Sequence, residues 1–360
     1  MDPAGLIPTP DTIPAPWGLF EFLGIFTLIL HLLFINVVLG GSLISLFSRL
    51  RQPDRPLETS LPGALARKIP TILAMAITFG VAPLLFVQVL YGHFFYTNSV
   101  LMGFYWIMII PLLVIAYYGA YIHARKYESA RGVSLFFLAL TSVILLVIAF
   151  IFENNVTMMV QPGRWPAYFD NRGGTTLNLS DPVLWPRYLH FVTASVAVAG
   201  LFSAVLRAFR RRRGIDEADD RVKSGLKIFS VATMIQVVIG FWFLLALPKP
   251  VMMKFMGQDL LHTVMLFIGI VLAVAAIMTS TLGRLIPTLI ILAAVLPVMV
   301  VMRSFVRTAY LEPYFKVESL ELVPQYDVML LFIAVLVIGV VIVGYMLKAA
   351  YDAVGRKEAA

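Results

Sequence analysis

The chain contains no cysteine and little charge. Its 360 residues are 60% hydrophobic, and only 13% are Asp, Glu, Lys or Arg. The lack of cysteine excludes disulfide bridges, thiolate-bound metals and covalent attachment of c-type haem by this chain. Soluble domains carry roughly 25% charged residues. The low charge therefore predicts an integral membrane protein.

Basic residues are missing from the first 17 positions, which contain five prolines and two aspartates. A secretory signal peptide begins with a positively charged region, so we expect no such peptide here. Residues 1–17 are predicted to form a short periplasmic segment, and the first helix is predicted to insert the chain into the membrane.

Long apolar runs fill most of the remaining sequence. Segments of about 20 apolar residues can cross a bilayer as helices. The sequence predicts an all-α polytopic membrane bundle with about nine transmembrane helices. The expected spans are 18–48, 69–93, 101–123, 133–153, 187–208, 225–247, 259–281, 285–303 and 328–348.

The basic residues predict the orientation of these helices. With the N-terminus outside, 20 of the 28 basic residues fall on the inner side, as the positive-inside rule requires. We expect one transmembrane domain, 18–348, with outer loops near 153–187 and 304–327 and a cytoplasmic tail at 349–360. No phosphate-binding loop or ATPase motif is found. The basic run 210–213 is followed directly by acidic residues, so we expect membrane lipid and no nucleic acid as a partner.

The two outer loops are rich in proline and aromatic residues. They include Trp165, Tyr168, Trp185, Tyr310 and Tyr314. Such residues form belts at the membrane–water interface. They are also suited to docking a periplasmic partner, and both interpretations stay open.

Three of the five histidines lie inside long apolar segments. Counting about 1.5 Å per residue from the inner helix ends places His31 at roughly 24 Å, His190 at roughly 26 Å and His262 at roughly 29 Å. Ionisable side chains inside the membrane are costly and are usually functional, and imidazole is a common axial ligand of haem iron. The alternative is a hydrogen bond to a neighbouring helix. The similar depth favours His190 and His262 as the two axial ligands of one haem.

His31 is predicted to bind a second haem iron, with His93 or Gln88 as its partner. Gln88 is closer in depth to His31 than His93 is, and His93 falls at the outer surface. His123 is expected to be a solvated helix end beside Arg125 and Lys126.

Three arginines, Arg187, Arg303 and Arg307, fall at outer helix ends. Arginine pairs bidentately with carboxylates, so these residues are candidates for holding haem propionates. Snorkelling toward the membrane interface is the alternative.

Three segments resemble subunit I of cytochrome bd quinol oxidase. Residues 31–40 (HLLFINVVLG) and 185–195 (WPRYLHFVTAS) resemble its two histidine haem-ligand segments, and residues 79–82 (FGVA) resemble a stretch of its second helix. The resemblance implies nine helices with the N-terminus outside. It also implies that His31 faces a high-spin, oxygen-side haem and that His190 ligates the low-spin haem through which electrons enter.

The chain also departs from that family. His262 falls near the family's methionine ligand, which suggests a bis-histidine haem. Only about ten residues, 249–258, stand where the family has a long quinol-oxidising loop. Residues 106–115 carry no acidic group, and residues 297–305 lack the family's signature around a glutamate ligand. These departures concern the third haem, the quinol site and the oxygen chemistry.

The leading hypothesis is a b-type haem subunit in the inner membrane of a bacterium, belonging to a quinol-linked oxidoreductase complex of a respiratory chain. It would hold one or two haem b groups, with quinone or quinol as a further candidate ligand. Electrons would pass between the quinone pool and a periplasmic cytochrome, with c-type expected, or an iron–sulfur subunit. One alternative is an oxygen-reducing bd-type subunit. Another is a haem-free transporter or scaffold, for which Pro83, Pro111 and Pro297 would break helices, although no internal repeat is evident.

Overall fold

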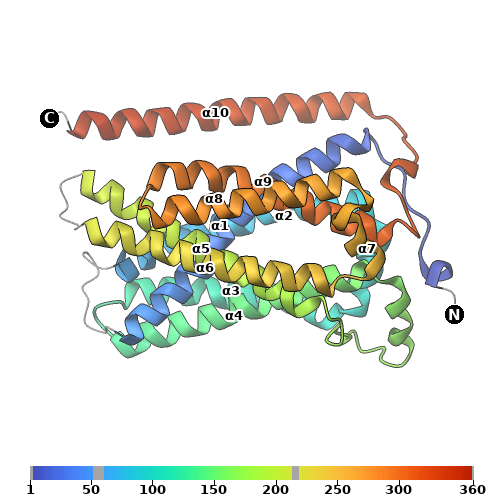
Figure 1. Ribbon diagram of the computed structural model, residues 1–360, viewed down its shortest axis with the longest axis horizontal. Coiled ribbons are helices and arrows are strands. Elements are labelled where there is room, and N and C mark those ends of the chain that lie inside the picture. The colour runs from blue at the N-terminus through green and yellow to red at the C-terminus, as the bar shows by residue number, and fades with distance from the viewer. Residues whose placement is uncertain (1–2, 52–60, 213–218, 359–360) are drawn as a thin grey trace.

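Long helices lie side by side in the computed structural model (Figure 1). The structure describes residues 3–51, 61–212 and 219–358. Parts of the charged segments considered above, among them Arg55, Arg213, Asp216 and Glu217, lie outside these ranges. The helices in chain order are η1 (Pro3–Leu6), α1 (Trp17–Arg51), α2 (Leu61–Leu101), α3 (Gly103–Arg125), α4 (Arg131–Met159), η2 (Pro162–Phe169), α5 (Leu184–Arg212), α6 (Asp219–Ala246), α7 (Lys249–Met253), η3 (Lys254–Gln258, a π-helix), α8 (Leu260–Thr281), α9 (Leu285–Leu311), η4 (Val317–Ser319) and α10 (Tyr326–Glu358).

Nine helices within the described residues are long and apolar enough to cross a membrane. The same residues form no strand, only one isolated bridge between Ile13 and Leu322. A helix satisfies its own backbone polar groups, which is required inside hydrocarbon. The predicted all-α bundle of nine spans is confirmed, and the protein is a multi-pass membrane protein.

The loops are shorter than predicted. Helix α4 continues through Glu153 to Met159, and α5 already begins at Leu184. Helix α9 continues through Ser304 to Leu311. The backbone hydrogen bonds of these helices continue through the polar ends, so each helix is longer than its apolar run. The expected tail, 349–360, is likewise helical as far as Glu358.

The prolines do not break the helices. Each of α2, α3 and α9 continues through Pro83, Pro111 or Pro297. The non-helical backbone angles inside α2 lie instead at Tyr91, where φ is −132° and ψ is 27°. The proline-broken helices expected for a transporter are therefore not found at these three positions.

Packing is most extensive between α1 and α2 and between α5 and α6, and α1 also packs along α5. At this crossing, a Cβ atom on Gly40 would overlap the backbone carbonyl of Ser195. The Ser195 hydroxyl donates a hydrogen bond to Asn36 Oδ1 at 2.9 Å, and both residues are buried. The backbones of α1 and α5 thus touch, which fixes their relative height.

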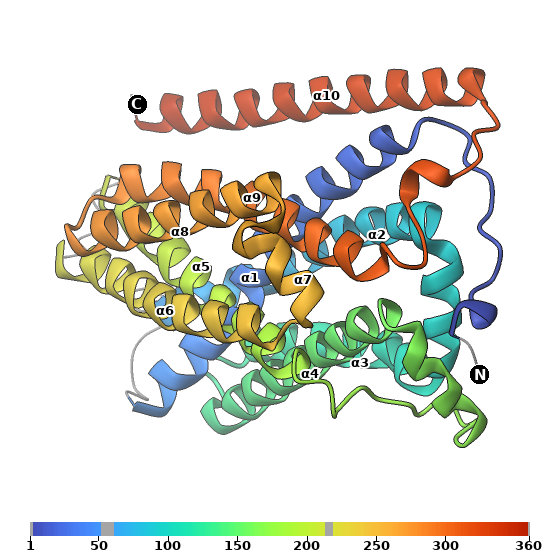
Figure 2. The ribbon, with the colours of Figure 1, turned by 45° about the vertical axis from the view of Figure 1, so that its right-hand side comes forward.

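Helix α10 stands apart from the bundle in both views (Figures 1 and 2). None of its residues between Tyr326 and Ala349 is buried. The segment before α10 runs beside the start of the chain, where Ile13 N donates to the Glu321 carbonyl and Val323 N to the Ile13 carbonyl, both at 2.9 Å. We call this side, where α1 begins, the N-terminal end of the bundle.

The aromatic residues of the long loops have different environments. Trp165 is buried, donates from Nε1 to the Met158 carbonyl at 3.1 Å and packs on Phe94. Trp185 and Tyr314 are exposed. Trp165 therefore belongs to the packed interior, and neither the interface belt nor a docking surface describes it.

Candidate functional site

His31 lies in the middle of α1 and faces α2. Its Nδ1 is 2.8 Å from the carbonyl oxygen of Ala76, so Nδ1 carries the proton that it donates there. Nε2 has no hydrogen-bond partner among the described residues. Metal-binding histidines usually donate their second ring N–H to a carbonyl or carboxylate. This ring is therefore oriented as a ligand would be.

His190 lies near the start of α5 and faces α6. Its Nε2 lies 3.1 Å from Nε2 of Gln236, which can donate an amide hydrogen to it. Its Nδ1 is buried without a hydrogen-bond partner. The free nitrogen of His190 is thus Nδ1, whereas that of His31 is Nε2.

Arg303, on α9, is the unusual charge of this region. Its side chain is partly buried within the bundle. Among the described residues it makes neither a hydrogen bond nor an ion pair, and it lies within electrostatic range of His31 and Glu153. A charge removed from water is costly unless it is paired. Arg303 is therefore suited to an anionic group that enters this space.

The other two candidate arginines already have partners. Arg187 Nε lies 2.6 Å from Glu153 Oε2. Arg307 donates to Ser304 Oγ at 3.1 Å and lies 3.8 Å from Glu21. Both side chains are only 12% exposed, so neither snorkels into water. Of the three arginines predicted to hold propionates, Arg303 alone has neither an anion nor a hydrogen-bond partner within the part of the chain that the structure describes.

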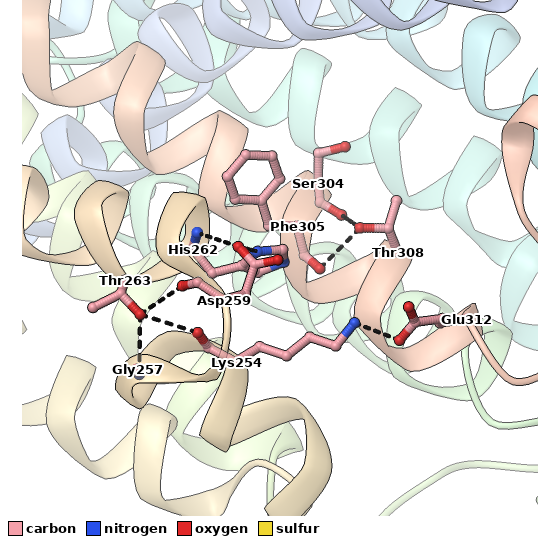
Figure 3. Close-up of polar contacts among 9 residues, drawn as sticks. All are labelled: Lys254, Gly257, Asp259, His262, Thr263, Ser304, Phe305, Thr308 and Glu312. Atoms are coloured by element: carbon pink, nitrogen blue, oxygen red, sulfur yellow. Dashed lines mark hydrogen bonds and ion pairs between the residues drawn. The ribbon is translucent and has the colours of Figure 1, made fainter.

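His262 lies in the first turn of α8, within a polar cluster at the N-terminal end (Figure 3). Asp259 caps this helix: its Oδ1 accepts from the His262 backbone nitrogen at 3.0 Å and lies 2.7 Å from His262 Nδ1. The ring packs against Phe255 and Phe305, and Nε2 is buried without a partner. The free nitrogen is again Nε2, as at His31.

We call this polar cluster at the N-terminal end the rim. Two of its carboxylates, Asp259 and Glu312, have lowered pKa values. Hydrogen bonds from the backbone and side chain of His262 lower the pKa of Asp259. A short contact from Lys254 lowers the pKa of Glu312 (Figure 3). Both groups stay ionised under mildly acidic conditions, which makes the rim a fixed charge pattern.

The remaining candidates lie elsewhere. His93 is buried, not at the interface, and packs between Phe94 and Phe315. Gln88 accepts a hydrogen bond from Tyr96 and lies about 12 Å along α2 from Gly80, which touches His31. The structure brings neither of them to His31.

His123 was expected to be solvated, but only 1% of it is exposed. Its Nδ1 contacts the hydroxyl of Ser134 at 2.9 Å. The neighbouring helix α4 covers this end of α3, and a charge count along the sequence does not reveal that cover.

The site also contains residues that the sequence analysis missed. Glu153 was assigned to a loop, so its pairing with Arg187, 34 residues away, was not anticipated. Nothing in the sequence around Gln236 indicates that it contacts His190, 46 residues away. The sequence around Asp259 does carry a signal, because an aspartate three residues before His262 is a typical helix N-cap.

These residues are compatible with haem. The described residues include no cluster of three histidine, cysteine or acidic side chains for a metal ion, whereas haem iron needs only one or two axial ligands from the protein. His31 and His262 each present an unpartnered Nε2, and Arg303 offers a cation for a carboxylate. No contact among the described residues joins the rings of His190 and His262, so their pairing stays a prediction.

No protein-family model matches the chain, and no curated protein matches it.

Proposed function

We propose that the protein is a b-type haem-binding subunit that passes electrons between the quinone pool and a periplasmic redox partner, in the inner membrane of a bacterium. The partner is a c-type cytochrome or an iron–sulfur subunit. His31, His190 and His262 are the proposed iron ligands, and one or two haem b groups are bound.

One observation carries the proposal: the His31 imidazole, inside a membrane-spanning helix, is held by a 2.8 Å contact from Nδ1 to the Ala76 carbonyl, while Nε2 has no hydrogen-bond partner among the described residues. The guanidinium of Arg303, which has no anion among those residues, acts on this imidazole electrostatically. A haem presents both complementary groups, an iron that takes an imidazole nitrogen and propionates that pair with arginine. A transporter that binds no anionic cofactor leaves this partly buried cation unexplained.

The chain's own residues would have separate tasks. The Ala76 carbonyl holds the His31 ring so that Nε2 faces away from α2, and Arg303 neutralises a carboxylate. When bound, haem supplies a one-electron carrier.

The first test is a reduced-minus-oxidised spectrum of the purified protein, combined with a pyridine haemochrome assay. We expect haem b, and protein produced with sufficient haem but purified without any would overturn the proposal.

The second test compares Arg303→Gln with Arg307→Gln, a control one helical turn away whose arginine has partners within the protein. A hydrogen bond to a charged group contributes about 1.5–3 kcal/mol. We therefore expect Arg303→Gln to lower haem affinity by roughly 10- to 100-fold. Arg307→Gln should have a smaller effect, and equal affinities in the two variants would refute the role of Arg303.

A further inference from the structure

The helices fall into two sets of four with the same pattern. In the first set, α1 packs most extensively with α2, followed by α3 with α4. In the second, α5 packs most extensively with α6, followed by α8 with α9. Shifting the first set by about 160 residues makes each of its helix ranges overlap the corresponding helix of the second set, although their ends do not coincide. Helices α1 and α5 both begin at the N-terminal end and run in the same direction (Figures 1 and 2).

The same shift relates the residues around the two histidines. His190 follows His31 by 159 residues, and Ser195 follows Asn36 by the same number. Asn36 and Ser195 are the two residues whose hydrogen bond joins α1 to α5. On the following helices, the shift is 160 residues from Ala76 to Gln236 and from Gly80 to Gly240. Ala76 and Gln236 supply the polar contacts to the two imidazoles. A constant shift over four pairs indicates a parallel internal repeat, an arrangement known in membrane proteins.

The glycine of the first half is in direct contact with its histidine. A Cβ atom on Gly80 would lie 2.8 Å from both Cε1 and Nδ1 of His31. Real Cβ contacts of this length are essentially absent, so any side chain here would displace the ring. Displacement would also break the 2.8 Å hydrogen bond to Ala76.

The glycine of the second half leaves slightly more room. A Cβ atom on Gly240 would lie 3.4 Å from Cε1 and 3.6 Å from Nδ1 of His190. These are ordinary van der Waals distances, so a methyl group fits here. A branched or longer side chain would reach the ring.

We propose that Gly80 and Gly240 are equivalent positioning residues of an internal repeat. Each leaves room for one imidazole, His31 or His190, to lie against the following helix, which also provides the ring's polar contact one turn earlier. That these imidazoles bind iron rests on the proposed function. The contact of each imidazole with its glycine does not depend on the proposed function.

The two glycines predict different responses to the same substitution. Gly80→Ala displaces His31, so the haem that is lost in His31→Ala is also lost in Gly80→Ala, while the His190-dependent spectrum is retained. In Gly240→Ala the added methyl group lies at contact distance from His190, so its effect on the His190-dependent spectrum is smaller than that of Gly80→Ala on the His31-dependent spectrum. Gly240→Leu removes the His190-dependent spectrum. The matched control is Gly41→Ala, because its Cβ would lie 3.7 Å from Leu65.

The experiment measures haem per chain by pyridine haemochrome and the absorption spectrum of each variant. Modification of the histidines by diethyl pyrocarbonate, followed by mass spectrometry, is measured on the same samples. We expect a several-fold change in His31 modification in Gly80→Ala relative to Gly41→Ala. This readout needs no haem, so failure of the proposed function and failure of this inference are distinguishable.

A double variant covers the case in which Gly80→Ala folds poorly. Removing the imidazole removes the clash, so Gly80→Ala combined with His31→Ala should unfold at the temperature of His31→Ala alone. The proposal is overturned if the double variant is as destabilised as Gly80→Ala. It is also overturned if Gly80→Ala matches Gly41→Ala in both His31 modification and spectrum, or if Gly240→Leu leaves the His190-dependent signals unchanged.

Discussion

His31 and His262 hold their rings in the same way but in different surroundings. Each Nδ1 lies within hydrogen-bond distance of an oxygen, and neither Nε2 has a hydrogen-bond partner among the described residues. At His31 the oxygen is a backbone carbonyl of α2, and Arg303 is the charge that acts on the ring. At His262 it is a carboxylate 42% exposed, beside the Lys254–Glu312 contact at the rim. The two rings therefore make the same kind of contact in the interior and at the rim. We expect the neighbouring charges to differ in their contribution to stability, because a pair withdrawn from water matters more than an exposed pair.

The largest effect is expected at Glu153. Glu153→Ala leaves Arg187, whose side chain is 12% exposed, without its anion. Because both groups keep some contact with water, we expect a cost somewhat below the roughly 3–5 kcal/mol of breaking a fully buried pair. Thermal unfolding in detergent should show a large loss of stability. An unchanged midpoint would mean that water already solvates the pair and that the interior does not differ from the rim.

Removing the unpaired interior cation should have the opposite sign. Arg303→Met keeps roughly the same volume and removes a partly buried cation that has no anion among the described residues, and an unpaired charge withdrawn from water is unfavourable. We expect a raised unfolding midpoint in haem-free protein and a reduced stabilisation by added haem. A lowered midpoint without haem would show that Arg303 already has a partner within the fold.

The ion pair at the rim should contribute little. Lys254→Ala removes a contact to a carboxylate 48% exposed, and exposed pairs contribute about 0–1 kcal/mol. The same unfolding assay should show a change several-fold smaller than that of Glu153→Ala. A loss of equal size would contradict the comparison.

The smallest effect concerns pH. The pKa of Asp259 is lowered in the folded protein, so folding favours its ionised form. Its contribution is complete above its ordinary pKa of about 3.9 and is lost as the pH falls through the lower folded value. Unfolding midpoints from pH 7 to pH 3 should therefore fall slightly less in Asp259→Asn than in the wild type. Identical curves would remove His262 from the interaction.

The sequence predicted the crossing helices well because long apolar runs are a local property. It misplaced helix ends such as Glu153–Met159, where polar residues remain helical and nearby groups absorb their charge. The cap of His262 by Asp259 was readable from their spacing. The partners of His31 and Arg187 were not, because Ala76 lies 45 residues and Glu153 34 residues away along the chain. Only packing brings such distant residues together.

The repeat was also hidden in the sequence. Its matching positions hold different residues. Asn36 and Ser195 bond to each other, whereas Ala76 contacts its histidine through the backbone carbonyl and Gln236 through the side-chain amide. His31 and Gly80 do recur as His190 and Gly240. Two identities separated by about 160 residues do not stand out in a chain that is 60% hydrophobic.

Helix α10 makes the number of membrane-spanning helices among the described residues odd. Two sets of four crossings bring the backbone back to the face of the membrane from which α1 departs, and the lone ninth crossing carries it to the other face. A reporter inserted after Gln325 and one placed beyond α10 should therefore label opposite compartments. Because none of the described residues of α10 between Tyr326 and Ala349 is buried, we expect the other eight membrane-spanning helices to pack together without it.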